Sequence, residues 1–222
     1  ISSSSTSMGP WDDMSPWAGS AGRIVIRGQN GDGSSAQSIT LDNSTISTTI
    51  SGGDNASGGD VTLINGSIVL TAQAVNLTND ARITADTSGG APAGWITFNA
   101  DNIDTSSGAK ISSQSTSIES GAGPGGSIVV QGKNGERYLA ESVNLDGSIL
   151  STTSMGGAGH ISILARSISL KNGTQIEAET NGDAPAGSIY LHTSDVAAFN
   201  NGVGSISIDN SIVSTSGIQG AA

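Results

Sequence analysis

The sequence of 222 residues contains no cysteine. Disulfide bonds, thiol nucleophiles and metal sites with sulfur ligands are therefore excluded, whereas the redox compartment is left open. Basic residues are also scarce, with 8 lysines and arginines against 19 aspartates and glutamates, for a formal net charge of −11. A nucleic-acid-binding protein needs a basic surface that displaces counterions from phosphates, so that class is excluded as well.

Long apolar runs are missing too. No stretch of about 18 apolar residues occurs, so no segment is expected to cross a bilayer as a helix. Aromatic residues make up only 3% of the chain, whereas there are 32 glycines, and the hydrophobic fraction of 35% consists largely of β-branched residues. β-Branched residues favour strands, and no glycine-free window has the 3.6-residue period of a helix. The sequence therefore predicts an all-β protein with many tight turns.

A short signature recurs along the chain. It consists of a glycine, one variable residue and three residues whose first and last members are apolar. Six copies begin at glycines spaced by 37, 35, 32, 33 and 28 residues, namely Gly22, Gly59, Gly94, Gly126, Gly159 and Gly187. A second apolar element follows, such as Ile168-Ser-Leu170, and a third comes after a polar corner, such as Ile176-Glu-Ala178. Each repeat therefore predicts three short strands.

The polar corners before the third strands share a residue type. Four of them contain an asparagine, at Asn43, Asn79, Asn172 and Asn210. Asparagine tolerates a left-handed backbone, and its side chain can cap a turn. We therefore expect these four residues to form a structural corner ladder on successive repeats.

Three short alternating strands, repeated about every thirty residues, are typical of a parallel β-helix in which each repeat is one coil. The predicted fold is a right-handed solenoid of about six coils, formed by residues 1–222 as a single segment. Extra residues predict loop excursions at 28–37, 64–74 and 132–142, and a Trp-, Pro- and Gly-rich insertion at 8–20. An Asn-Gly pair between apolar runs also predicts a small hairpin at Ile64–Leu70.

Both ends of the sequence lie in the register of the repeats. Residues 1–4 match the third strand, and the last repeat stops just before another signature is due. A solenoid needs polar or helical caps, and none is visible. We therefore expect the segment to belong to a longer array, with a second hypothesis that its ends stack on neighbouring copies.

The repeat at 158–180, AGHISILARSISLKNGTQIEAET, resembles the coils of filamentous haemagglutinin-like exoproteins. The resemblance extends from Gly22 to Ser216. It implies a secreted protein of the bacterial cell surface, exported through a dedicated outer-membrane partner. It does not imply a particular activity, because the same coils serve adhesins, toxin stalks and surface fibres.

Exposed aromatic residues are the candidate contact residues. Trp11 and Trp17 lie in the 8–20 insertion, and Trp95 and Tyr190 occupy positions that the alternation places outward. Exposed rings can stack on sugars or anchor a protein contact. An equally weighted alternative is that the insertion folds back and covers Trp95 as a local plug.

Catalysis, metal binding and cofactor binding are not predicted. The outward acidic candidates are Asp60, Asp104, Glu177 and Glu179, and no cluster of them is evident in the pattern. Glycoside hydrolysis needs two carboxyl groups about 5–10 Å apart. The histidines, His160 and His192, lack a second ligand at the spacing of a metal site.

The leading functional hypothesis is a structural and adhesive segment of a surface exoprotein, a rigid rod that presents loops to a host-cell, matrix or glycan receptor. The second is a subunit of a self-assembling extracellular fibre or sheath that stacks end to end. A polysaccharide-active enzyme is the third, and it requires an acid cluster that the sequence lacks.

Overall fold

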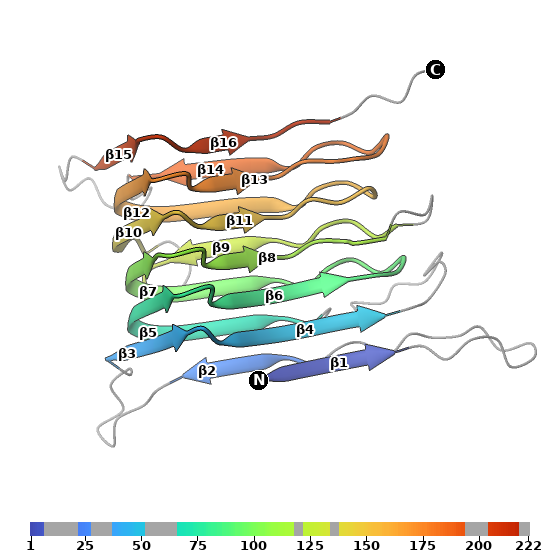
Figure 1. The fold of residues 1–222 in the computed structure, drawn as a ribbon, viewed down its shortest axis with the longest axis horizontal. Coiled ribbons are helices and arrows are strands. Elements are labelled where there is room, and N and C mark those ends of the chain that lie inside the picture. The colour runs from blue at the N-terminus through green and yellow to red at the C-terminus, as the bar shows by residue number, and fades with distance from the viewer. Residues whose placement is uncertain are drawn as a thin grey trace, which may run out of the picture.

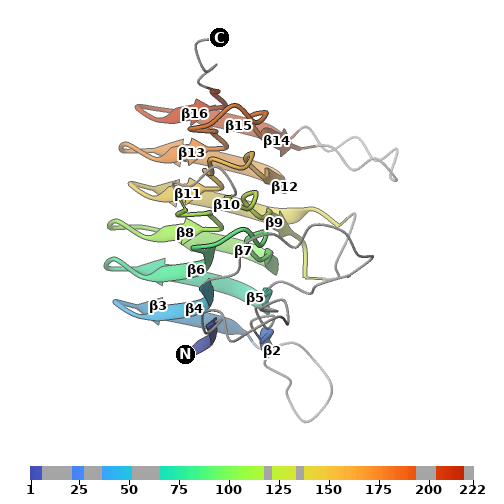
Figure 2. The same cartoon turned by 90° about the vertical axis from the view of Figure 1, so that its right-hand side faces the viewer.

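The computed structural model describes residues 1–6, 22–27, 37–51, 66–117, 122–133, 138–193 and 204–217. All helix and strand structure in these ranges consists of β-strands, which confirms the all-β prediction. Every strand pairing is parallel, and successive repeats lie one above another in chain order (Figure 1). The view turned by 90° shows the same stack of layers (Figure 2).

The strands form two sheets. The seven-stranded sheet contains, in spatial order, β1 (Ser2–Thr6), β4 (Thr45–Ser51), β6 (Arg82–Thr87), β8 (Lys110–Ser112), β11 (Ile149–Ser151), β13 (Gln175–Glu177) and β16 (Ile212–Ser214). The nine-stranded sheet contains β2 (Ile24–Arg27), β3 (Ser38–Asp42), β5 (Ile68–Thr78), β7 (Ile96–Thr105), β9 (Ile128–Gln131), β10 (Ala140–Asp146), β12 (His160–Lys171), β14 (Ser188–His192) and β15 (Ser205–Ile208).

The predicted right-handed parallel β-helix with three short strands per coil is wrong. The structure has two parallel sheets, because the first and second predicted strands are continuous in β5, β7 and β12. These junctions contain no residue with a positive φ. Buried positions instead shift by one residue after Ala72, Ala100 and Ala165, which bends each long strand without ending it.

One group of four strands closes on itself. β9 and β10 belong to the same repeat, and each of them pairs with both β7 and β12. The pairing order β7–β9–β12–β10 therefore returns to β7, and the seven-stranded sheet is separate from this group. The closed group arises because the strand of one repeat is divided into β9 and β10, whereas the strands of the repeats on either side, β7 and β12, are continuous.

The core consists of in-register rows of aliphatic residues. One row runs through the seven-stranded sheet at Ile46, Ile83, Ile111, Leu150 and Ile176, all at most 3% exposed. Another joins Ile68, Ile96, Ile128 and Ile161 of the nine-stranded sheet, all fully buried. Replacing one such isoleucine with alanine is expected to cost about 2–5 kcal/mol of stability.

A row of glycines precedes the strands of the nine-stranded sheet. A Cβ added to Gly94, Gly126, Gly159 or Gly187 would overlap the carbonyl oxygen of the glycine one layer below. The glycine of the second signature is Gly66, not Gly59, because Ile68 pairs with Ile24 on one side and Ile96 on the other. The second signature was therefore predicted seven residues too early.

This shift also corrects the loop predictions. Residues 68–74 belong to β5, so the excursion predicted at 64–74 and the hairpin predicted at Ile64–Leu70 are wrong. The insertion at 8–20 and most of the 28–37 excursion lie outside the described residues. In the 132–142 segment, the Gly132 N–H donates to the Tyr138 carbonyl at 2.7 Å, and Ala140–Ser142 already belong to β10.

The corner asparagines all have a left-handed backbone. Their φ angles are 44° at Asn43, 52° at Asn79, 55° at Asn172 and 46° at Asn210. Their amides do not bond one another: Asn79 Nδ2 donates to Asp42 Oδ1 at 2.6 Å, and Asn172 Nδ2 donates to Asp146 Oδ1 at 2.7 Å. Each of these two bonds joins a corner to the corner of the preceding repeat.

Candidate functional site

The predicted contact residues are not gathered into one patch. Trp95 lies directly before β7 and is 63% exposed, whereas Tyr190 lies in β14 and is 48% exposed. β9 and β12 separate the two positions, which corresponds to about 14 Å along the stack. Trp11 and Trp17 lie outside the described residues, so the covering of Trp95 by their segment stays a prediction.

Tyr190 instead has an aromatic neighbour on its own strand. Its ring stacks on that of His192, with the ring centroids 5.9 Å apart and the planes 20° from parallel. The two residues are two positions apart on a strand, so they point to the same face. The alternation of outward positions is the sequence signal for this exposed pair, which was not predicted.

A partly buried carboxylate lies on the seven-stranded sheet at Asp86. Its oxygens accept hydrogen bonds from Ser112 Oγ at 3.1 and 3.2 Å and from the Gln114 N–H at 2.9 Å. Burial raises the pKa of Asp86 above its ordinary value, and the two hydrogen-bond donors and the charge of Lys110 oppose that rise only in part. The sequence pattern does not single out Asp86, because its partial burial depends on the neighbouring strand.

Glu177 and Glu179 form an acidic pair near the other end of the same sheet. Burial raises the pKa of Glu177, repulsion from Glu179 raises it further, and Lys110 lowers it. Glu179 accepts a short hydrogen bond from Ser214 Oγ. Three strand spacings, about 14 Å, separate the β13 row from that of Asp86, too far for the three acids to act on one bond.

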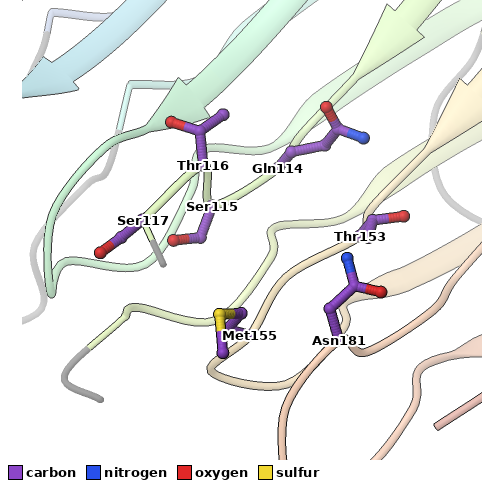
Figure 3. A pocket seen from close by; sticks show the side chains of 7 residues that line it. All are labelled: Gln114, Ser115, Thr116, Ser117, Thr153, Met155 and Asn181. Carbon is purple, nitrogen blue, oxygen red and sulfur yellow. The ribbon is translucent and has the colours of Figure 1, made fainter. Parts of the chain in front are cut away.

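A surface pocket of about 290 Å³ lies where three neighbouring strands of the seven-stranded sheet end (Figure 3). The segment after β8 contributes Gln114, Ser115, Thr116 and Ser117. The segment after β11 contributes Thr153 and Met155, and the corner after β13 contributes Asn181. All of the polar side chains in this lining are uncharged hydroxyls and amides.

The pocket coincides with an interruption in the strand ladder. Thr87 is bridged to Ser115, and Ser154 is bridged to Thr180, but within the described ranges no bridge joins Ser115 to Ser154. The register of β8 and β11 places those two serines opposite each other. The ladder between these two layers therefore ends before the two serines, although Ser154 Oγ still joins the layers by donating to the Gly123 carbonyl at 2.7 Å.

Hydrogen bonds fix part of the pocket lining. Gln114 Nε2 donates to Ser151 Oγ at 2.6 Å, and Ser151 Oγ lies 3.0 Å from Thr153 Oγ1. Ser115 is only 7% exposed, and its hydroxyl has no hydrogen-bond partner. No sequence motif predicts this pocket, because Ser- and Thr-rich stretches of similar composition follow other strands of the same sheet.

The described part of the chain contains no group of three or more histidine, aspartate or glutamate side chains placed to hold a metal ion. It also contains no helix with the length and hydropathy needed to cross a membrane. No protein-family model matches the chain, and no curated protein or solved structure is significantly similar to it.

Proposed function

We propose that this chain is a structural and adhesive segment of a secreted bacterial surface protein of the filamentous haemagglutinin-like type. In this proposal, an outer-membrane partner exports the parent protein, and the stacked sheets act as a rigid scaffold. Outward side chains and loops then contact a host cell, the extracellular matrix or a glycan.

The observation that supports this function most directly is the contrast between inward and outward positions. Inward rows repeat the same aliphatic residues through successive layers, whereas the outward row that contains Trp95 reads Ser67, Trp95, Ser127, His160 and Ser188. Core packing therefore constrains one face of each strand and leaves the other free to vary. Large exposed rings at Trp95 and Tyr190 on such a surface are suited to contact with a partner.

The test is binding of the purified protein to cultured cells and to immobilised matrix proteins and glycans. The Trp95→Ala/Tyr190→Ala double variant is expected to lose at least half of the bound protein, while its circular dichroism spectrum stays unchanged. Tyr138→Ala is the matched control, because Tyr138 is also an exposed aromatic residue, 54% accessible, but belongs to neither β7 nor β14. Equal binding by the double variant and the control would count against a role for these two rings, and no binding by the wild type would refute the contact function.

We propose end-to-end association as the second candidate, on a separate observation. Ile206 and Ile208 are 44% and 51% exposed, although they pair with the buried core residues Ile168 and Leu170. Val213 is 38% exposed opposite buried Ile176. An open core layer of this kind favours stacking of a second β-layer. Sedimentation velocity and electron microscopy at rising concentration should then show linear assemblies that Ile206→Ser/Ile208→Ser abolishes, and a monomer at all concentrations would exclude this candidate.

A further inference from the structure

We propose that Asn181–Gly182 is a site of spontaneous deamidation, and that the fold protects a second Asn-Gly pair, Asn172–Gly173, from the same reaction. Asparagine is one of the chemically labile residues, and a following glycine, which lacks a Cβ, leaves its backbone nitrogen open to the asparagine side chain. The inference is independent of the proposed contact function, because it involves neither a receptor nor the exposed aromatic residues.

The reaction needs only water as a co-reactant. The backbone nitrogen of Gly182 attacks Cγ of Asn181, so a new N–Cγ bond forms. The bond from Cγ to the side-chain nitrogen breaks, and this nitrogen leaves as ammonia with the proton of the Gly182 N–H. Water then opens the resulting succinimide ring at either carbonyl and gives aspartate or isoaspartate. The net change replaces a side-chain NH2 with OH, which is ionised at neutral pH.

The side chain and the nitrogen that would react at Asn181 are accessible. Asn181 is exposed and lines the surface pocket after β8, β11 and β13, where water reaches its side chain (Figure 3). Within the described ranges, its side-chain amide has no hydrogen-bond partner. The Gly182 N–H donates to Thr180 Oγ1 at 3.3 Å, a long bond inside the same segment. Neither group therefore has to give up a strong interaction before the reaction begins.

Both reacting groups of Asn172–Gly173 are occupied instead. Asn172 Nδ2 donates to Asp146 Oδ1 at 2.7 Å, and the Gly173 N–H donates to the Asn210 carbonyl at 2.7 Å. These bonds tie the pair to the preceding and to the following repeat. Both must break before the side chain can turn onto the backbone nitrogen, and the bond to the carboxylate alone lowers the population of the open state at least about tenfold.

Deamidation at Asn181 changes a segment that is bonded to both neighbouring layers. The Asn181 N–H donates to the Ser154 carbonyl at 3.1 Å, and the Thr180 N–H donates to the Ser216 carbonyl at 2.8 Å. Isoaspartate lengthens the main chain at this point by one carbon, which disturbs these bonds. The product also adds a negative charge to a chain whose formal net charge is already −11. We therefore expect the modified protein to be less stable than the unmodified one.

The experiment is mass spectrometry of the whole 222-residue chain after incubation in mildly alkaline buffer. Digestion after glutamate, at Glu177 and Glu179, places Asn172 and Asn181 on separate peptides. Electron-transfer fragmentation then locates the modified residue and distinguishes isoaspartate from aspartate. We expect Asn181 to deamidate at least about tenfold faster than Asn172 in the folded protein.

Unfolding and one substitution test whether the fold causes this difference. In urea both pairs lose their surroundings, so the two rates should become similar. Asp146→Ala removes the acceptor of the Asn172 amide and should raise the rate at Asn172 in the folded protein, while the rate at Asn181 stays the same. The comparison in urea decides the point if Asp146→Ala fails to fold, which circular dichroism shows.

Asn181→Gln is the matched control for the effect on stability. Glutamine keeps an amide at this position but must form a larger ring, so it deamidates far more slowly. After the same incubation, the wild type should have a lower melting temperature than Asn181→Gln, whereas the two should be alike before it. Because deamidation elsewhere in the chain affects both proteins equally, the difference between them reports on Asn181.

Several results would overturn the inference. Equal rates at the two asparagines in the folded protein, or a faster rate at Asn172, would refute it. So would an Asn181 that stays unmodified in the folded protein under conditions that deamidate it in urea. An unchanged rate at Asn172 in folded Asp146→Ala would refute protection by the amide bond. None of these results depends on whether the protein binds cells, matrix or glycans, so the contact function is tested separately.

Discussion

The left-handed corner at Asn172 gives a quantitative test of how the repeats are stabilised. Asn172→Ala removes the 2.7 Å bond to Asp146 and places a Cβ-bearing residue without a local hydrogen-bonding side chain at a φ of 55°. The lost hydrogen bond contributes about 0.5–1 kcal/mol, and the left-handed backbone costs alanine about 1–2 kcal/mol. We therefore expect a loss of about 2 kcal/mol, which lowers the melting temperature by about 4–8 °C in a chain of this size.

Two companion variants separate the hydrogen bond from the backbone. Asn144→Ala is the matched control, because Asn144 Nδ2 also donates to an aspartate, Asp104, at 2.7 Å, but Asn144 lies inside β10 with an ordinary φ. It should lose only the hydrogen-bond part, about 0.5–1 kcal/mol. The loss for Asn172→Gly should lie between those of the two alanine variants, since glycine accepts a positive φ but increases the conformational entropy of the unfolded chain.

The assay is thermal and urea unfolding followed by circular dichroism for the wild type and the three variants. The expected order of destabilisation is Asn172→Ala, then Asn172→Gly, then Asn144→Ala. Equal losses for the two alanine variants would refute the argument, because they would show that the left-handed backbone adds nothing to the hydrogen bond. A glycine variant less stable than Asn172→Ala would refute it too.

Three further changes follow from the packing and the charges. Gly159→Ala should prevent folding or cost more than about 3 kcal/mol of stability, since its Cβ would overlap the Gly126 carbonyl oxygen. Gly173→Ala should cost only about 1–2 kcal/mol, because its Cβ meets nothing within 4 Å and only its positive φ is unfavourable. Soluble yield and melting temperature measure both effects. Asp86→Asn should raise the melting temperature at pH 7. Burial raises the pKa of Asp86 above its ordinary value of 3.8. At a pH between the pKa of the unfolded chain and that of the folded protein, the folded state therefore holds a proton that the unfolded chain has released. Stability falls as pH rises through this window, so the stability gain of the variant should vanish on acidification below it. Gly147→Asn should leave stability unchanged or raise it slightly, because Gly147 has a φ of 59° at a corner where other repeats have asparagine, and a lower melting temperature would contradict this equivalence.

Local rules predicted much of each repeat correctly. The alternation of apolar and polar residues places Ile161 and Ile163 inward and His160 and Ser162 outward, as the burial of β12 shows. Steric limits on the backbone explain why asparagine occurs at corners with a positive φ. Both rules need only a few consecutive residues, so the sequence contains the information they require.

Pairing between repeats could not be predicted in the same way. Gly59-Asp-Val-Thr-Leu63 and Gly66-Ser-Ile-Val-Leu70 have the same pattern, seven residues apart. The choice between them depends on contacts with other layers, where Gly66 lies below Gly94 and Ile68 pairs with Ile24. No local propensity distinguishes the two segments, because both satisfy the strand alternation.

The division of the chain into strands failed for a related physical reason. The segment Ala72-Gln73-Ala74 lacks an apolar pattern and falls within the excursion predicted at 64–74. In the structure, Ala74 still pairs with Asn102 of the next layer, so the ladder continues through the bend. Small side chains at Ala72, Ala100 and Ala165 let the strand bend while its backbone bonds are kept.

The surface pocket after β8, β11 and β13 depends on the same long-range pairing, so no sequence motif predicts it. Ser115 and Ser154 occur in stretches of similar composition, and each is bridged to one neighbouring layer. Within the described ranges no bridge joins the two serines, yet Ser154 Oγ donates to the Gly123 carbonyl at 2.7 Å, so a side chain and not the strand ladder holds the layers together beside the pocket. A contact of this kind depends on which layers are neighbours. A single repeat motif does not contain that information, so the pattern of one repeat cannot predict where the ladder ends.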